Sequence, residues 1–147
     1  MKKQAIIKLF TLTGILFFCM HVFAQNAENW TAKQLMEPKD LADAITFKNN
    51  IPVIINVGPD AVIPQSIDAG MAKEKEGIKK LKSDLGKLSR DSKVVIYCGC
   101  CPFEHCPNVR PAINVLKEMK FTNYFLLNLP HNIKTDWIDK RYPVAKN

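Results

Sequence analysis

The chain has 147 residues, 47% of them hydrophobic, and a formal net charge of +7 at pH 7. This length is sufficient for one domain with a sizeable hydrophobic core. The positive charge is mild, and no basic stripe interleaved with aromatic residues is present, so composition gives no support for nucleic-acid binding.

The first 24 residues have the layout of a secretory signal peptide. Two lysines follow the initial methionine, Leu9 to Met20 form an apolar centre without charge, and Ala24 ends the segment with a small residue. The apolar run is short for a membrane span, and an uncleaved anchor extending to Phe23 is the alternative. We therefore predict a signal peptide at 1–24, a single domain at 25–147 and a periplasmic or secreted location, with no membrane contact after cleavage.

Removal of this segment changes both the charge and the cysteine count. It takes away three lysines and no acidic residue, so the net charge falls to +4. It also removes Cys19. The four remaining cysteines lie within nine residues, where they can close one loop but cannot connect distant parts of a fold. These are Cys98, Cys100, Cys101 and Cys106.

Helical and strand patterns alternate along the rest of the chain. Short β-branched apolar runs predict buried strands, and apolar residues at helical spacing predict amphipathic helices. In the lysine-rich stretch, the charges form the solvated face of such a helix. In chain order we expect a short helix at 31–35, a helix from Pro38, a strand at 52–57, a short strand around Ile67, a helix at 75–88, a strand at 93–98, a helix at 108–119, a strand at 123–129 and a final helix at 132–140.

This alternation predicts an α/β domain, with a parallel sheet covered by helices on both faces. In such sheets, ligands bind beyond the carboxyl ends of the strands. Cys98 ends the strand predicted at 93–98, so the cysteine loop lies where this fold places its chemistry. Asn108 is expected to cap the helix that follows the loop, with Pro111 tolerated in its first turn.

Four segments follow one another in order over about residues 31–143. They are "IPVIINVGP", "AVIPQSIDAG", "KVVIYC" followed by a loop, an arginine and a helix, and "NYFLLNLPHNIKTDWIDKRYPV". In this order the segments resemble the rhodanese-like domain family. The resemblance implies a single rhodanese-like domain, in which the cysteine at the strand end accepts a sulfane sulfur as a persulfide and passes it on.

The resemblance also implies roles for individual residues. Cys98 is the predicted nucleophile, and Arg110 is the predicted partner of a small sulfur-containing anion. A helix N-terminus and a nearby cation both favour a thiolate, and the planar arginine fork suits oxyanions such as thiosulfate. The expected function is sulfane-sulfur transfer or thiol redox, of the thiosulfate sulfurtransferase type, to a thiol acceptor and without a cofactor. The predicted substrate-binding residues of the loop, one of whose thiols would resolve the intermediate, are Gly99, Cys100, Cys101 and Cys106.

Several positions depart from the family pattern. Eleven residues separate Cys98 from Arg110, which makes the loop longer than is usual in the family. The family's acid in the first core strand is Asn56 here, its arginine two residues on is Gly58, and its histidine before "IP" is Val62. The scaffold is therefore kept, while most polar positions outside the loop have changed.

Three other interpretations of the loop stay open. The cysteines, with His105, can hold zinc or copper(I), although their spacing fits no common zinc pattern and we assign no metal ligand. Cys106 can instead close the loop as a structural disulfide, and Cys98 can be a buried core residue. The alternative function is therefore a non-catalytic module whose cysteine-rich loop binds a metal ion or a partner.

Overall fold

The computed structural model describes residues 30–146, so the signal peptide predicted at 1–24 lies outside the described residues. Within 30–146, no helix combines the length and the apolar character that a membrane crossing requires. The described chain forms a five-stranded sheet of order β1-β5-β4-β2-β3, and every neighbouring pair is parallel. The strands are β1 (Leu35–Met36), β2 (Val53–Asn56), β3 (Ile67–Asp68), β4 (Val94–Tyr97) and β5 (Tyr124–Leu127).

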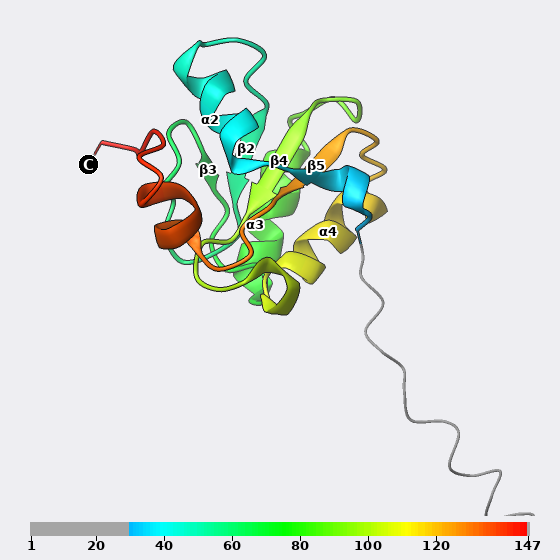
Figure 1. Cartoon of the computed structure of the whole chain (residues 1–147). Helices are drawn as coiled ribbons and strands as arrows, with labels where there is room; N and C mark the ends of the chain where they lie inside the picture. The colour runs from blue at the N-terminus through cyan, green and yellow to red at the C-terminus, as the bar shows by residue number, and fades with distance from the viewer. Residues whose placement is uncertain (1–29, 147) are drawn as a thin grey trace, which may run out of the picture.

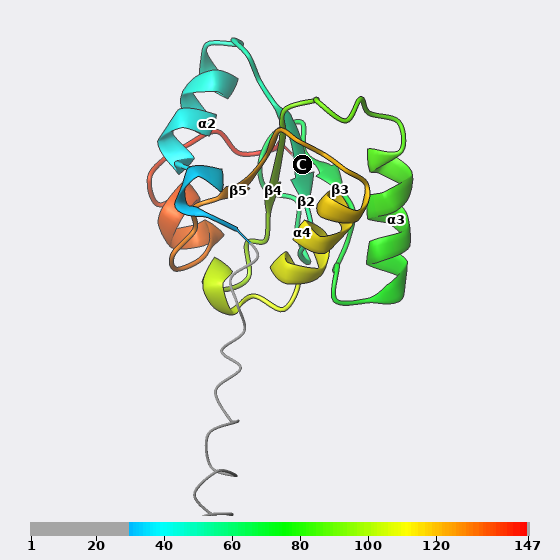
Figure 2. The ribbon, with the colours of Figure 1, turned by 90° about the vertical axis from the view of Figure 1, so that its right-hand side faces the viewer.

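Helices cover both faces of this sheet. In Figure 2, α3 and α4 lie on one side of the strands, and α2 and the C-terminal helix η3 lie on the other. The predicted α/β class is therefore confirmed. The helices are α2 (Pro38–Thr46), α3 (Lys75–Leu85) and α4 (Val109–Glu118), with short 3-10 turns η1 (Ala32–Gln34) and η2 (Phe103–His105) and the π-helix η3 (Lys134–Ile138).

The N-terminal edge of the sheet differs from the prediction. We expected one helix over 31–35, but only the short turn η1 forms, with the Thr31 N–H donating to Gln34 Oε1 at 3.0 Å. Leu35 leaves the turn and pairs with Leu126 as part of β1 (Figure 1). Pairing with β5 therefore outweighs a local helix preference that is weak over so few residues.

The central strand β4 fixes the position of the cysteine loop. All four of its residues are buried, and it is paired with β2 on one side and β5 on the other. Successive side chains of a strand point to opposite faces. Val94 and Ile96 pack in the core beneath α3 and α4, and Tyr97 packs in the core beneath α2 and η3. Cys98, which follows Tyr97, belongs to the α3 and α4 side.

Tyr97 also holds the segment after β2 against the end of β4. Its ring is fully buried, and its hydroxyl accepts the Ile63 N–H at 3.2 Å. The same hydroxyl lies 3.2 Å from Ser66 Oγ. Burial raises the pKa of Tyr97, so the phenol stays neutral and available for these bonds. The segment after β2 is thereby anchored beside the carboxyl edge of the sheet.

Candidate functional site

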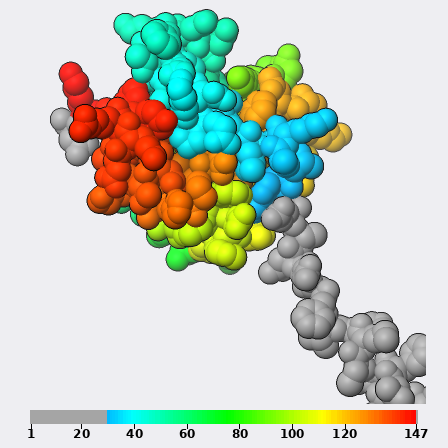
Figure 3. Space-filling view, viewed as in Figure 1, coloured from blue at the N-terminus to red at the C-terminus, as the bar shows by residue number. Residues whose placement is uncertain are grey.

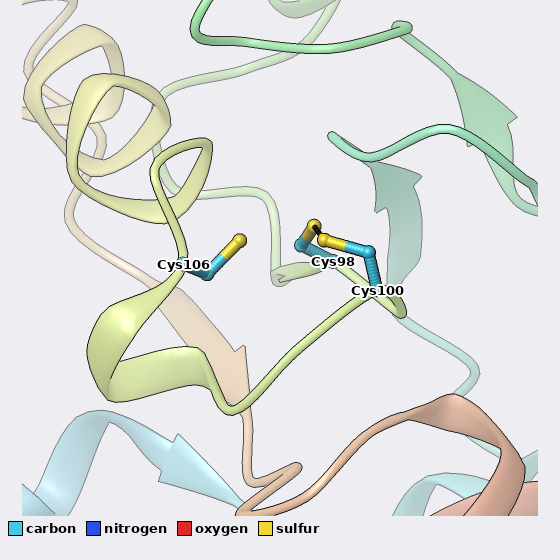
Figure 4. A group of neighbouring side chains, drawn as sticks. All are labelled: Cys98, Cys100 and Cys106. Carbon is cyan, nitrogen blue, oxygen red and sulfur yellow. Dashed lines mark hydrogen bonds between the residues drawn. The ribbon is translucent and has the colours of Figure 1, made fainter.

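The structure gathers three of the loop thiols at the carboxyl end of β4. The Sγ atoms of Cys98 and Cys100 are 3.3 Å apart. Cys106 follows the turn η2, and the sulfurs of Cys98, Cys100 and Cys106 all lie within 4.8 Å of one another. Figure 4 shows Cys106 pointing toward the other two sulfurs from the opposite side of the loop. A long loop therefore still returns to the strand end.

The thiols differ in their exposure to solvent. Cys98 and Cys106 are buried, whereas Cys100 is exposed and Cys101 is partly exposed. The Cys100 and Cys101 sulfurs are 3.1 Å apart, and all four cysteines in the described part of the chain are free thiols. The site therefore combines buried thiols with thiols that solvent can reach.

Asn108 connects the loop to two other segments. It occupies the position before α4 as predicted, but its side chain makes no capping bond. The side chain is instead nearly fully buried, and its Oδ1 accepts the Lys73 N–H at 2.9 Å. Its Nδ2 donates to Cys98 Sγ at 3.5 Å. The carboxamide thus holds the strand-end sulfur in place, a role that the sequence pattern did not reveal.

The turn after β2 forms a wall against Cys98. The Asn56 side chain accepts the Gly58 N–H at 3.2 Å and donates to the Gly58 carbonyl at 2.9 Å. It also donates to Asp68 at 3.0 Å. A β-carbon at Gly58 would lie only 2.7 Å from Cys98 Sγ, so no other residue fits here without displacement. In the sequence, Asn56 and Gly58 are departures from the family pattern, and nothing local indicates their contacts at the end of β4.

The hydrogen bonds of the cluster favour a negative charge on Cys98 over one on Cys100 or Cys106. Hydrogen bonding from Cys106 is the main cause that lowers the pKa of Cys98 to about 5 against the opposing effect of burial, with further donors in Cys100 and Asn108. Burial is the main cause that raises the pKa of Cys100 to about 12, and its hydrogen bonds to Cys101 and Cys98 add to the effect. The hydrogen bond from Cys106 to Cys98 likewise raises the pKa of Cys106. One thiolate is therefore surrounded by protonated thiols.

The loop is packed against the C-terminal segment (Figure 3). Gly99 accepts the Ile133 N–H at 3.0 Å, and the Phe103 N–H donates to the Leu129 carbonyl at 3.2 Å. A β-carbon at Gly99 would lie 2.8 Å from Ile133 Cβ. Gly99 is therefore required for close packing, in addition to any part in substrate binding.

A small pocket opens beside the exposed thiol of the cluster. Its volume is about 150 Å³, and Gly99 and Cys100, both predicted substrate-binding residues, form part of its wall. Residues from the turn after β2 and from the C-terminal segment complete it. The full lining is Pro59, Asp60, Val62, Gly99, Cys100 and Ile133.

Arg110 has its described contacts elsewhere. Its Nη1 donates to the Glu104 carbonyl at 2.9 Å, and its guanidinium lies over the Trp30 ring at 5.3 Å from the centroid. Its Nε is buried without an acceptor among the described residues. Anion binding by Arg110 stays a prediction. His105 is exposed and is not among the three residues whose donor atoms gather at the strand end.

The chemistry of the cluster is that of thiolate sulfur. A thiolate attacks divalent sulfur directly. Two cysteine sulfurs 3.3 Å apart can therefore take part in disulfide exchange or persulfide transfer. Three sulfurs within 4.8 Å of one another can also bind one soft metal ion, since thiolates are the ligands that such ions prefer. The arrangement therefore supports two kinds of site.

Comparison with known proteins identifies the fold of this chain. No protein-family model matches the sequence, and no curated protein is detectably similar to it. A rhodanese-like domain from Anabaena, solved in solution, superimposes with a TM-score of 0.56 at 13% identity, over 78% of this chain and 80% of that one. A full-length protein from Lactobacillus plantarum superimposes with a TM-score of 0.57 at 14% identity, over the whole of both chains. The chain therefore has a rhodanese-like fold, as the sequence resemblance predicted.

Proposed function

We propose that this protein is a rhodanese-fold thiol protein in which Cys98 forms a persulfide or mixed disulfide and Cys100 resolves it. The observation that carries this proposal is the 3.3 Å separation of the two sulfurs at the carboxyl end of the central strand. Parallel α/β sheets generally bind ligands at this edge, which supports the proposal. Transfer of sulfane sulfur or thiol redox is the activity that this pair supports best.

The proposed reaction begins at the Cys98 thiolate. It attacks the sulfane sulfur of a donor, the donor's S–S bond breaks, and the leaving group departs with the electron pair. An external thiolate can then take the outer sulfur and restore Cys98. Alternatively, the Cys100 sulfur attacks Cys98 Sγ, which forms a Cys98–Cys100 disulfide and releases hydrosulfide.

The surroundings of Cys98 support its role as the nucleophile. The Asn108 amide and the thiol of Cys100 donate to its sulfur and favour the charged form. Its backbone follows a strand that is paired on both sides, which keeps the sulfur in one position. Export to an oxidising compartment is part of this proposal and is supported only by the pattern of residues 1–24.

The test is intact-mass spectrometry of the reduced protein after reaction with inorganic polysulfide and rapid alkylation. We expect wild type to form an intramolecular disulfide and release hydrosulfide. The Cys100→Ser variant should instead retain one added sulfur atom, because its resolving thiol is missing. Cys98→Ser should react at least about tenfold more slowly, because the thiolate that the hydrogen bonds of the cluster stabilise is missing.

The neighbouring thiol Cys101 provides a matched control. Its sulfur contacts Cys100 at 3.1 Å, and Cys101→Ser removes a loop thiol while the Cys98 and Cys100 pair stays intact. This variant should still form the Cys98–Cys100 disulfide and release hydrosulfide. Equal reaction rates in wild type and Cys98→Ser would disprove the proposal.

A second candidate function is metal binding by Cys98, Cys100 and Cys106. The observation that favours it is the approach of their three sulfurs to within 4.8 Å of one another. Three thiolates suit a soft ion such as copper(I). Anaerobic competition with a copper(I) chelator should show one ion bound per chain and weaker binding in Cys106→Ser. If Cys106→Ser binds copper(I) as wild type does, this candidate is wrong.

A further inference from the structure

The pocket beside Cys100 has a mainly apolar lining that includes one acidic residue. Val62, Ile133 and Pro59 supply apolar surface, and Asp60 is the one charged residue in the lining. We infer that the substrate is a small alkyl disulfide or persulfide with a neutral or cationic group, rather than an anionic donor such as thiosulfate. This inference rests on the proposed function and names its substrate class.

The position of the pocket directs a substrate to the reacting sulfurs. Cys100 is part of its wall, and Cys98 Sγ lies 3.3 Å from the Cys100 sulfur. A volume of about 150 Å³ equals the share of about five water molecules in the liquid. An alkyl group of a few carbon atoms therefore fits, with its sulfur at the thiol pair.

The charge of the lining disfavours anions. No lysine or arginine is among the pocket residues, and the guanidinium of Arg110 contacts Glu104 and Trp30 instead. A sulfonate or carboxylate would leave water for an apolar wall beside the Asp60 carboxylate. Desolvation and like-charge repulsion both oppose this transfer. An ammonium group also loses hydration, but the Asp60 carboxylate attracts it, and a hydroxyl group carries no charge to be repelled.

The walls of the pocket are held by backbone hydrogen bonds. The Ile133 N–H donates to the Gly99 carbonyl at 3.0 Å, and the Ala145 N–H donates to the Val62 carbonyl at 2.8 Å. The hydroxyl of Tyr97 accepts the N–H of Ile63, the residue after Val62. Because the wall is already formed, few protein groups need to become ordered when a substrate binds. Differences in fit between substrates should therefore appear in their rates of reaction with the thiol pair.

The reduction of a disulfide R–S–S–R by this site uses the Cys98 thiolate, the Cys100 thiol and one proton from solvent. The Cys98 thiolate attacks one sulfur, the S–S bond breaks, and the first R–S⁻ takes the proton of the Cys100 thiol. The Cys100 thiolate then attacks Cys98 Sγ, breaks the mixed disulfide and releases the second R–S⁻, which is protonated by solvent. The protein dithiol is oxidised to a disulfide, and R–S–S–R is reduced to two R–SH.

Three symmetric disulfides of similar length test the inference. They are cystamine, which is cationic, 2-hydroxyethyl disulfide, which is neutral, and 3,3′-dithiodipropionate, which is anionic. The oxidation rate of reduced protein is measured by quenched alkylation and mass spectrometry, and divided by the rate of each reagent with a neutral free thiol. We expect the normalised rates of cystamine and 2-hydroxyethyl disulfide to exceed that of dithiodipropionate by about tenfold, the factor that 1.4 kcal/mol produces.

Variants of the pocket separate charge from shape. Asp60→Asn should lower the cystamine rate about threefold and leave the 2-hydroxyethyl disulfide rate unchanged, because an exposed charge contributes modestly. Asp91→Asn removes an equal charge near the amino end of β4 and should change neither rate. Val62→Phe should slow all alkyl disulfides by filling the pocket, while reaction of Cys98 with inorganic polysulfide persists.

The outcomes distinguish the two proposals. A normalised dithiodipropionate rate equal to or above that of cystamine overturns the substrate class and leaves the role of Cys98 intact. The same holds if no disulfide reacts while polysulfide still does. If Cys98→Ser is oxidised by each disulfide as fast as wild type, the proposed function itself fails.

Discussion

Two polar regions lie at the carboxyl edge of the same sheet, and they differ in how their side chains are used. One is the cysteine cluster at the end of β4. The other is at the ends of β1 and β5, where Glu37 and Asn128 follow the strands and Asp136 faces them across a pocket of about 240 Å³. Both regions meet the positional rule for a ligand site in a parallel sheet.

In the second region, the acidic groups are used to hold the chain together. Asn128 donates to Glu37 at 2.8 Å, and Asp136 accepts the His131 N–H at 2.7 Å and the Asn132 N–H at 3.1 Å. In the cysteine cluster, by contrast, donors converge on one reactive sulfur. Position at the strand ends is therefore not enough to identify a reactive site, and the partners of each polar atom decide its role.

The largest effect on stability is expected at Asp136. Asp136→Ala leaves the His131 and Asn132 N–H groups without their carboxylate acceptor, and a hydrogen bond to a charged group typically contributes about 1.5–3 kcal/mol. Urea unfolding should show this loss, while the alkylation rate of Cys98 stays unchanged. Asp139→Ala, which removes an exposed ion pair with Lys134, is the control and should cost at most about 1 kcal/mol. A change in Cys98 reactivity in Asp136→Ala would show that the two regions are coupled, which contradicts the distinction between them.

The next effect is expected at Gly58, on the wall of the cysteine cluster. Gly58→Ala places a methyl group 2.7 Å from Cys98 Sγ, and such overpacking typically costs about 1–3 kcal/mol. Unlike Asp136→Ala, this variant should also change the alkylation rate of Cys98, because the sulfur must move. Gly86→Ala, at the end of α3, has helical backbone angles and should leave that rate as in wild type. Unchanged Cys98 reactivity in Gly58→Ala would contradict this packing.

The pH profile of alkylation should distinguish Cys98 from the other thiols. With a pKa of about 5, Cys98 stays ionised as the pH falls from 8 to 6, and its rate should fall only near pH 5. At pH 6 the thiolate fraction of Cys98 exceeds that of an ordinary cysteine by about three-hundredfold. The lower intrinsic nucleophilicity of a less basic thiolate removes most of this gain and leaves a rate difference of about tenfold. Iodoacetamide labelling with peptide mapping measures this. A Cys98 rate that falls tenfold per pH unit above pH 6 would disagree with a stabilised thiolate.

The smallest effect is expected at Asn108. Asn108→Asp keeps an acceptor for the Lys73 N–H but removes the donor to Cys98 and adds a negative charge beside it. The pKa of Cys98 should therefore rise, and its alkylation at pH 5.5 should slow by about threefold. The pH at which Cys98 reacts at half its maximal rate provides the readout, since a purely structural role would leave it unchanged. Asn114→Asp, in the interior of α4, is the matched substitution and should not shift that pH.

Strand periodicity and the segment order were sufficient to predict the sheet, its helical cover and the rhodanese-like fold. They also placed Cys98 at a strand end and grouped the thiols. The short strand β1 was missed because its pairing with β5 is non-local. The contacts of Asn108 and Gly58 with the Cys98 sulfur were missed for the same reason, because both residues lie at least ten positions from Cys98 along the chain. Side-chain direction across a long loop depends on packing that no local pattern encodes.

The aromatic contact beneath the loop gives the protein an optical reporter. Its two tryptophans are Trp30 and Trp137. The Trp30 ring meets the Phe103 ring of the loop edge-on at 5.7 Å and also lies under Arg110, whereas Trp137 is buried in the core on the opposite face. Any chemistry that shifts the loop therefore changes the surroundings of one tryptophan and spares the other. Emission from Trp30, with Trp137 replaced by phenylalanine, would follow the state of the thiols in real time without an added label.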